Sequence, residues 1–318
     1  MIEARGLTKR YGALVALDSL SLDVGPGEVY GFIGPNGAGK STTMKILACL
    51  MRPDKGTARV AGYDIATDGD KIRRSLGYMP DFLGVYDDLN VDEYLQFFGS
   101  AYGIDRRRRR VVIDQVLELT DLTQKKKSPV DGLSRGMQQR LGVARVLLHD
   151  PKVLLLDEPS SGLDPRARIE MRELLTELGR MGKSLMISSH ILSELAEMCT
   201  CIGIIERGKL LFTGSIQEAY ARTRGNERIR IRLEPGGPDA ASIASVLEQS
   251  DRVSRATVEP APEGQPAAEI TIDLVAGEHA HHFLIEQLLR AGARIASFSP
   301  ETVKLEDAFL KLTTGALQ

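Results

Sequence analysis

Short apolar segments of two kinds predict a mixed sheet in the first 80 residues. Residues 2–7, 13–17 and 20–24 are predicted as antiparallel strands: hydrophobic and polar residues alternate in much of 2–7 and in 20–24, and 13–17 is apolar throughout. Residues 29–33 form a continuous apolar run that is typical of a buried strand, and helical spacing of apolar residues follows in 41–51. Another strand is predicted at 57–60, and residues 72–78 lead back into the sheet.

The middle of the chain changes from strand to helix spacing and back. Apolar residues recur at helical intervals from about 88 to 150, which predicts a helical insert. In the segment 152–157, residues 153–156 form a continuous apolar run before Asp157, as expected of a parallel strand buried on both faces. Helices (168–180 and 192–199) then alternate with strands (184–188, 202–205 and 209–213). The sequence therefore predicts an α/β fold.

A second domain is expected after residues 224–226. Its predicted elements are strand 228–233, helix 240–249, strands 255–259 and 270–274, helix 278–291, strand 294–298 and helix 305–312. The order βαββαβ is that of a small α+β ferredoxin-like domain. We expect two domains, 1–222 with its helical insert at about 82–150, and 227–318.

Composition argues against several classes of protein. The 318 residues carry a net charge of −2, so we expect no nucleic-acid partner. No apolar run approaches a signal peptide core or a membrane span, which predicts a cytosolic chain unless something else anchors it. The three cysteines lack redox or zinc spacing. The histidines at 279, 281 and 282 favour a surface helix, and the basic runs 106–110 and 125–127 favour solvated surface.

A glycine-rich loop follows the buried strand and precedes the helix. Its residues, which fit GxxxxGK[ST], are Gly34, Pro35, Asn36, Gly37, Ala38, Gly39, Lys40, Ser41 and Thr42. Glycines let backbone N–H groups surround phosphate oxygens, and the helix start adds partial positive charge. Lys40 would reach the β- and γ-phosphates, Ser41 would bind Mg²⁺, and Thr42 would support the first helical turn. The loop predicts binding of a nucleoside triphosphate with Mg²⁺.

Two carboxylates end the buried strand 152–157. Asp157 and Glu158 would lie at the sheet edge where open α/β folds bind ligands. Asp157 would hold Mg²⁺, and Glu158 would orient and polarise the attacking water.

With these motifs, residues 1 to about 222 resemble the ATP-binding subunits of ABC transporters. The resemblance rests on further motifs in the family's order, namely Tyr11 for the adenine, 78–81 for the Q-loop, 133–138 for the signature, 161–164 for the D-loop and His190 for the switch histidine. It implies a P-loop NTPase core with an antiparallel β subdomain and a helical insert. It also implies catalytic roles for Lys40, Glu158 and His190, and nucleotide contacts by Asp81 and Asp164.

Two motifs depart from the family's pattern. Asp81 stands where the Q-loop has glutamine, and we expect it to report the nucleotide state to the membrane partner. In the signature, Arg135 and Met137 replace a glycine and the glutamine, while Ser134 and Gly136 remain. The resemblance implies that Ser134 and Gly136 contact the γ-phosphate that is bound by the phosphate loop of a second copy. This predicts a head-to-tail dimer of ATPase subunits, and we expect a homodimer.

The last residues favour one branch of the family. Residues 303–313 resemble the end of ATPase subunits of type-2 exporters, those that move drugs, lipids, glycans or sodium. The prediction is an exporter motor that works with separate transmembrane permease subunits and lies peripherally on the cytoplasmic face of the cell membrane. An importer ATPase with a ligand-sensing C-terminal domain stays open as an alternative, as does a soluble ABC protein acting on ribosomes or DNA.

Overall fold

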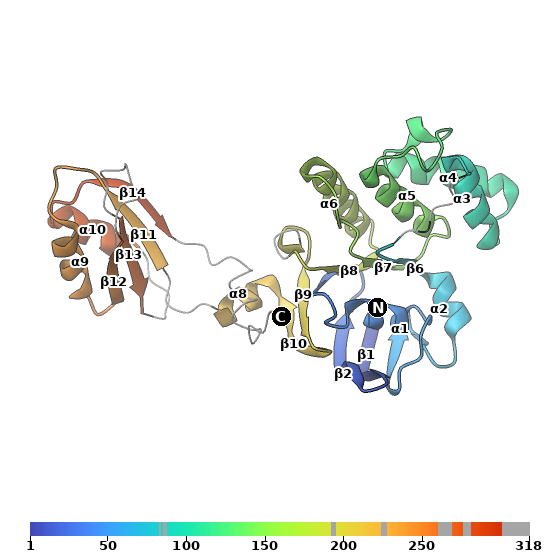
Figure 1. Cartoon of the computed structure of the whole chain (residues 1–318), viewed down its shortest axis with the longest axis horizontal. Coiled ribbons are helices and arrows are strands. Elements are labelled where there is room, and N and C mark those ends of the chain that lie inside the picture. The colour runs from blue at the N-terminus through green and yellow to red at the C-terminus, as the bar shows by residue number, and fades with distance from the viewer. Residues whose placement is uncertain are drawn as a thin grey trace. The chain divides into compact units, whose positions relative to one another are not determined.

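The computed structural model describes residues 1–82, 84, 88–191, 195–223, 228–259, 269–275 and 281–300. It divides into two compact units, Met1–Ala219 and Tyr220–Lys311 (Figure 1). Of the predicted helices, 305–312 lies outside the described residues, and 192–199 and 278–291 lie partly outside them. Among the described residues, no helix is both long and apolar enough to span a bilayer.

The first unit begins with an antiparallel sheet. It contains β1 (Ile2–Tyr11), β2 (Leu14–Val24), β4 (Lys55–Val60) and β5 (Tyr63–Asp64), in the order β2-β1-β4-β5. The prediction of two strands in 13–24 was wrong, because β2 is continuous. Its register with β1 shifts between Leu7 and Lys9, and Ser19 has φ 55°. The polar pair Asp18–Ser19 is an irregularity within one strand rather than a turn.

A second sheet carries the parallel strands. Its members are β3 (Val29–Ile33), β6 (Leu76–Met79), β7 (Val153–Asp157), β8 (Ser184–Ser189), β9 (Cys201–Glu206) and β10 (Lys209–Ser215). The order is β10-β9-β3-β8-β7-β6, and only β10 pairs in the antiparallel sense among these described strands. The carboxyl ends of β3, β6, β7 and β8 therefore share one edge.

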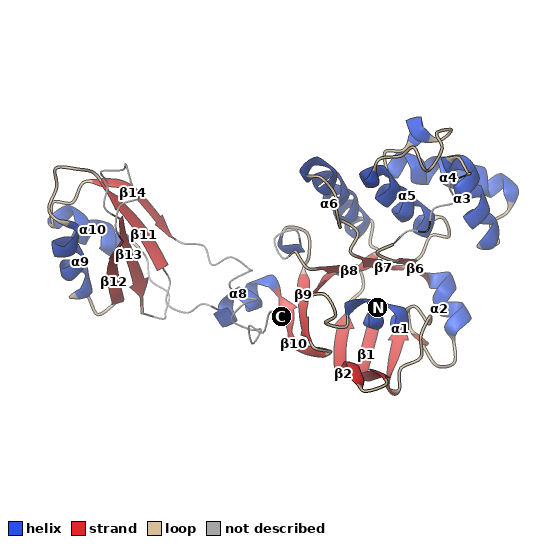
Figure 2. Ribbon diagram, viewed as in Figure 1, coloured by secondary structure: helices blue, strands red, loops and turns tan. Residues whose placement is uncertain are grey.

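Helices cover the parallel sheet on both faces. Helix α1 (Lys40–Leu47) lies between the two sheets and shares one core with residues of both. On the other side of β6–β8, Figure 2 shows α5 (Arg135–Leu147) and α6 (Pro165–Arg180). Helix α2 (Gly69–Ser75) precedes β6, and α8 (Ile216–Thr223) follows β10. Helix α1 is shorter than the predicted 41–51, because Cys49 turns the chain with φ 56°.

The helical pattern between 88 and 150 is confirmed. Helix α3 (Val91–Ala101) and α4 (Arg106–Leu119) pack on α5, and the 3-10 helix η1 (Thr123–Lys125) lies between α4 and α5 in the chain. Each α-helix has a capping side chain, from Asn90, Asp105 and Ser134 respectively. Such caps satisfy backbone N–H groups that helix starts leave unpaired.

The second unit has one four-stranded antiparallel sheet. The elements are β11 (Arg228–Leu233), α9 (Ala240–Glu248), β12 (Val253–Glu259), β13 (Glu269–Leu274), α10 (His282–Arg290) and β14 (Ile295–Pro300). The strand order is β12-β13-β11-β14. Alternate residues of β11 are buried in a core that both helices share. One face of this sheet is therefore covered by α9 and α10.

Candidate functional site

The loop between β3 and α1 passes so close to neighbouring backbone that glycine is required. A Cβ at Gly34 would lie 2.3 Å from the carbonyl oxygen of Ile205. Gly39 has φ 113°, and a Cβ there would lie 2.7 Å from the carbonyl oxygen of Ala16. Gly39 is also the N-cap of α1 and brings no capping side chain, so the helix start faces the loop uncapped. This geometry suits a bound anion.

Lys40 lies across its own loop. Its side chain is only 6% exposed, and its Nζ donates to the carbonyl oxygens of Gly34 at 2.6 Å and Pro35 at 3.3 Å. Ser41 is exposed and Thr42 half-buried at the start of α1. The buried Thr43 hydroxyl donates to the Gly39 carbonyl at 2.9 Å and ties the helix to the loop. A lysine cation and a free serine hydroxyl are therefore presented together.

A buried serine holds the two acidic residues at the end of β7. Asp157 pairs with Ser188 of β8 in parallel register. The Ser188 hydroxyl donates to Asp157 Oδ1 at 2.6 Å and accepts the backbone N–H of Glu158 at 2.9 Å. Ser188 was not among the predicted site residues. The signal for it was a hydroxyl at the end of the predicted strand 184–188.

Glu158 connects the loop lysine with the switch histidine. Its Oε1 lies 3.3 Å from Lys40 Nζ, and its Oε2 lies 2.8 Å from His190 Nδ1. The side chain of Glu158 is 12% exposed and that of His190 is 47% exposed. Glu158 has φ 51°, a left-handed conformation that is uncommon outside glycine and recurs at functional sites. The structure thus brings together Lys40, Glu158 and His190, which lie far apart in the sequence.

Asp81 lies at the same edge, one strand away. Strand β6 pairs with β7 so that Met79 faces Leu156, and Asp81 follows two residues later. Burial raises the pKa of the Asp81 carboxyl, and the charges of Asp157 and Glu158 raise it further. Burial also raises the pKa of Tyr78 to about 12, and the neighbouring carboxylates add to this shift. The edge therefore concentrates negative charge next to the loop.

The signature and D-loop residues serve as helix caps. The Ser134 hydroxyl accepts the N–H of Met137 at 3.3 Å at the start of α5. The Asp164 carboxylate accepts the N–H of Ala167 at 3.0 Å at the start of α6. A Cβ at Gly136 would lie 2.9 Å from the Cβ of Ala167, so the two helix starts pack closely. Within the described part of the chain, no hydrogen bond joins Ser134, Gly136 or Asp164 to Lys40 or Glu158.

Tyr11 lies at the end of β1, in the antiparallel sheet. It is 46% exposed, and its hydroxyl lies 3.0 Å from the Sδ of Met51. An exposed ring can offer its face to a planar ligand.

The donor atoms at the edge suit a magnesium ion. Ser41 supplies an exposed hydroxyl and Asp157 a buried carboxylate, and Mg²⁺ prefers oxygen ligands. The described residues contain no cluster of three or more His, Cys, Asp or Glu side chains able to hold a metal by themselves. Mg²⁺ is usually bound through one or two carboxylates together with substrate phosphates. The residues present fit that mode.

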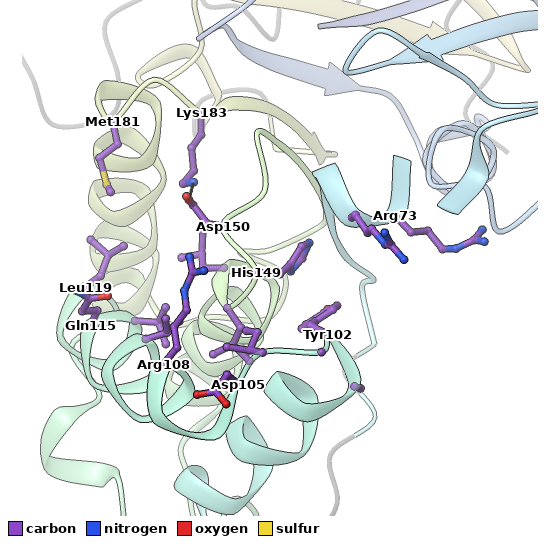
Figure 3. A pocket seen from close by; sticks show the side chains of 18 of the residues that line it. Arg73, Tyr102, Asp105, Arg108, Gln115, Leu119, His149, Asp150, Met181 and Lys183 are labelled. Atoms are coloured by element: carbon purple, nitrogen blue, oxygen red, sulfur yellow. Dashed lines mark hydrogen bonds and ion pairs between the residues drawn. The ribbon is translucent and has the colours of Figure 1, made fainter. Parts of the chain in front are cut away.

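The large cavity of Figure 3, about 1520 Å³, lies at the opposite edge of the parallel sheet. Its lining includes Tyr102, Arg108, His149, Asp150 and Lys183. The His149 ring stacks on Tyr102 at 4.2 Å and its Nε2 lies 3.0 Å from the carbonyl oxygen of Leu76, the first residue of β6. Asp150 and Lys183 form an ion pair just before β7 and β8 begin. The cavity is therefore separate from the carboxyl edge that carries Lys40 and Glu158.

Comparisons with known proteins agree with the geometry. The family model described as "ABC transporter" matches residues 17–161. The probable multidrug ABC transporter ATP-binding protein YbhF of Escherichia coli is 38% identical over 72% of the chain, which spans only 39% of that protein. The linearmycin resistance ATP-binding protein LnrL of Bacillus subtilis is 30% identical over 100% of both chains. The Nod factor export ATP-binding protein I of Paraburkholderia xenovorans is 33% identical over 100% of this chain and 98% of its own.

Solved structures match about two thirds of the chain. An ATP-binding subunit of an ABC transporter aligns with TM-score 0.63 and 29% identity, covering 70% of this chain and 92% of the other. A dimeric bacterial ABC transporter cassette aligns with TM-score 0.62 and 25% identity, covering 68% and 99%. The predicted P-loop NTPase fold and the resemblance are confirmed. The chain belongs to the ATP-binding proteins of ABC transporters.

Proposed function

We propose that the chain is the ATPase motor subunit of an ABC exporter and hydrolyses Mg²⁺-bound ATP. The observation that carries the proposal is the line of contacts from Lys40 to Glu158 to His190 beside the glycine loop. A buried cation, a carboxylate and an imidazole at a phosphate loop match the needs of phosphoryl transfer to water.

Each residue has a role that follows from its position. Lys40 exchanges its contacts with the loop carbonyls for the β- and γ-phosphates, which the uncapped start of α1 also attracts. Ser41 and Asp157 would hold Mg²⁺, which neutralises charge on the phosphates. Glu158 orients the attacking water and accepts its proton, while His190 holds the second carboxylate oxygen of Glu158. Tyr11 offers its exposed ring to the adenine, and Asp81 and Asp164 border the nucleotide.

The site needs a second copy to be complete. Ser134 and Gly136 stand at a helix start and, within the described residues, contact neither Lys40 nor Glu158 of their own chain. In a head-to-tail homodimer, they would face the γ-phosphate bound by the other copy.

The remaining assignments follow from the relatives and the topology. Relatives named as a probable multidrug ABC transporter ATP-binding protein and as a Nod factor export ATP-binding protein support transport outward by separate permease subunits, with this chain peripheral on the cytoplasmic face of the membrane. The domain limits 1–222 and 227–318 remain part of the proposal, and the division of the chain between Ala219 and Tyr220 supports a boundary in this region. The strand order of the second unit supports a ferredoxin-like accessory domain.

Trapping of an ATP-bound dimer tests the proposal. Glu158→Gln keeps the shape of the side chain but removes the base, so ATP should bind without being hydrolysed. Light scattering should then show a dimer with Mg²⁺ and ATP, whereas the matched variant Glu173→Gln, changed at an exposed position of α6, should behave as wild type. Glu158→Gln that binds ATP and stays monomeric would contradict the head-to-tail site.

A further inference from the structure

An arginine of the signature motif lies against the loop that follows Glu158 in the same chain. Arg135 is the first residue of α5, and its guanidinium covers Gly162. A Cβ at Gly162 would lie 2.3 Å from Arg135 Cζ and within 2.6 Å of both terminal nitrogens. A side chain at 162 would therefore push the guanidinium out of its present place. Gly162 has φ 67°, which also favours glycine.

The covered loop runs directly from Glu158 to the start of α6. The N–H of Ser161 donates to the Glu158 carbonyl at 3.0 Å, and the N–H of Leu163 donates to the Ser160 carbonyl at 3.3 Å. Two overlapping turns therefore connect Glu158 to Asp164. One end is held by the bond from the Glu158 N–H to Ser188, and the other by the Asp164 cap. Arg135 packs on the middle, at Gly162, to which no side-chain hydrogen bond is found among the described residues.

Among the described residues, the guanidinium has no ionic partner that would explain its position. Arg135 forms no ion pair with any described residue. Its positive charge does lower the pKa of the Asp81 carboxyl and so opposes part of the upward shift caused by burial. Its neighbour Gly136 packs on Ala167 of α6. The helical insert thus contacts the segment 158–167 of the nucleotide-binding core at two adjacent residues.

We propose that Arg135 is a positioning residue that holds the loop 158–164 of its own chain, so that Glu158 keeps its place between Lys40 and His190. The inference rests on the proposed ATP hydrolysis. It assigns Arg135 a role within its own chain, whereas its neighbour Ser134 acts on the other copy.

Steady-state kinetics provide the first test. A displacement of about 1 Å at a reacting group can lower the rate about a hundredfold, so Arg135→Gly should lower kcat between about tenfold and a hundredfold. Binding of Mg²⁺ and ATP to Lys40 and the loop should change less than about twofold, because Arg135 does not touch them. Arg106→Gly is the matched control, because Arg106 is the exposed first residue of α4. An unchanged kcat in Arg135→Gly, or an equal loss in both variants, would overturn the inference.

Gly162→Ala tests the contact from the other side. The added Cβ displaces the guanidinium, so kcat should fall as in Arg135→Gly. In the Arg135→Gly background the alanine meets no guanidinium, and only the backbone strain at φ 67° remains, so the further loss should be smaller than in wild type. Independent, multiplicative losses in the double variant would mean that the two residues do not act through their contact.

Mixed dimers separate action within the chain from action on the other copy. Lys40→Ala, which lacks the phosphate-binding lysine, is mixed with an excess of Arg135→Gly or of Ser134→Asp. Aspartate caps a helix as well as serine does but repels phosphate. The Lys40→Ala chain can supply an intact signature to the site of its partner. The Lys40→Ala chain should therefore restore activity when it is mixed with Ser134→Asp. It should not restore activity when it is mixed with Arg135→Gly. Restoration in both mixtures would overturn the inference.

Failure of the proposed function would be distinguishable. If wild type shows no ATPase activity, the proposed function fails, and hydrogen exchange still tests the contact in the nucleotide-free chain. The amides of Ser161 and Leu163 should exchange faster in Arg135→Gly than in wild type or Arg106→Gly. Unchanged exchange at both amides would overturn the positioning role whatever the activity.

Discussion

Removal of the Ser188 hydroxyl should destabilise the first unit, because that single atom serves two buried groups. It donates to the carboxylate of Asp157, which is only 2% exposed, and accepts the N–H of Glu158. A hydrogen bond to a charged group contributes roughly 1.5–3 kcal/mol and a neutral one about 1 kcal/mol. Ser188→Ala should therefore lower the free energy of unfolding by about 2–4 kcal/mol. At about 2–4 °C per kcal/mol for a unit of this size, the Tm should fall by roughly 5–15 °C.

Thermal unfolding followed by circular dichroism measures the change, in the absence of nucleotide. The chain has no tryptophan, so intrinsic tryptophan fluorescence offers no probe. Ser100→Ala on the exposed face of α3 is the control and should shift stability by no more than about 0.5 kcal/mol. A Tm for Ser188→Ala within 1 or 2 °C of the control would, at about the same conversion, refute the reasoning.

Two further substitutions probe the same edge. A carboxyl whose pKa is raised in the folded state binds its proton more tightly there than in the unfolded chain, so the folded state loses stability as pH rises through that range. Asp81→Asn should therefore raise the Tm of the nucleotide-free protein at pH 7, and this difference in Tm from wild type should vanish below about pH 4. Thermal unfolding measured at a series of pH values tests this. Gly34→Ala places a Cβ 2.3 Å from the Ile205 carbonyl oxygen and should abolish nucleotide binding in equilibrium titrations; binding at wild-type affinity would show that the loop tolerates the shift.

Local patterns were sufficient for the loop and for most elements around it. The GxxxxGK[ST] spacing placed Lys40 and Ser41 correctly at a helix start, because the glycines and the lysine are consecutive in the chain. The same local reasoning was wrong for β2, where Asp18 and Ser19 were interpreted as a break. The register between β1 and β2 shifts at these residues, so β2 continues through them as one strand. This shift depends on the pairing with β1.

Contacts between distant residues could be predicted only through the family resemblance or were missed. The contact of Glu158 with His190 joins β7 to the end of β8, and their spacing in the sequence does not encode it. Ser188 was missed because a serine that ends a strand usually meets solvent. Its buried bond to Asp157 depends on the parallel register of β7 and β8. The packing of Arg135 on Gly162 likewise depends on how the insert meets the core.

The central claim is that one working site takes residues from two copies of the chain. Lys40→Ala and Ser134→Asp are each expected to be inactive alone, because each disables every site of its own dimer. In a mixed dimer, Lys40 comes from one chain and Ser134 from the other, which restores one intact site. Measurement of ATPase activity after mixing the two purified variants tests this directly. The head-to-tail arrangement predicts clear activity in the mixture, and a mixture no more active than its separate components would contradict it.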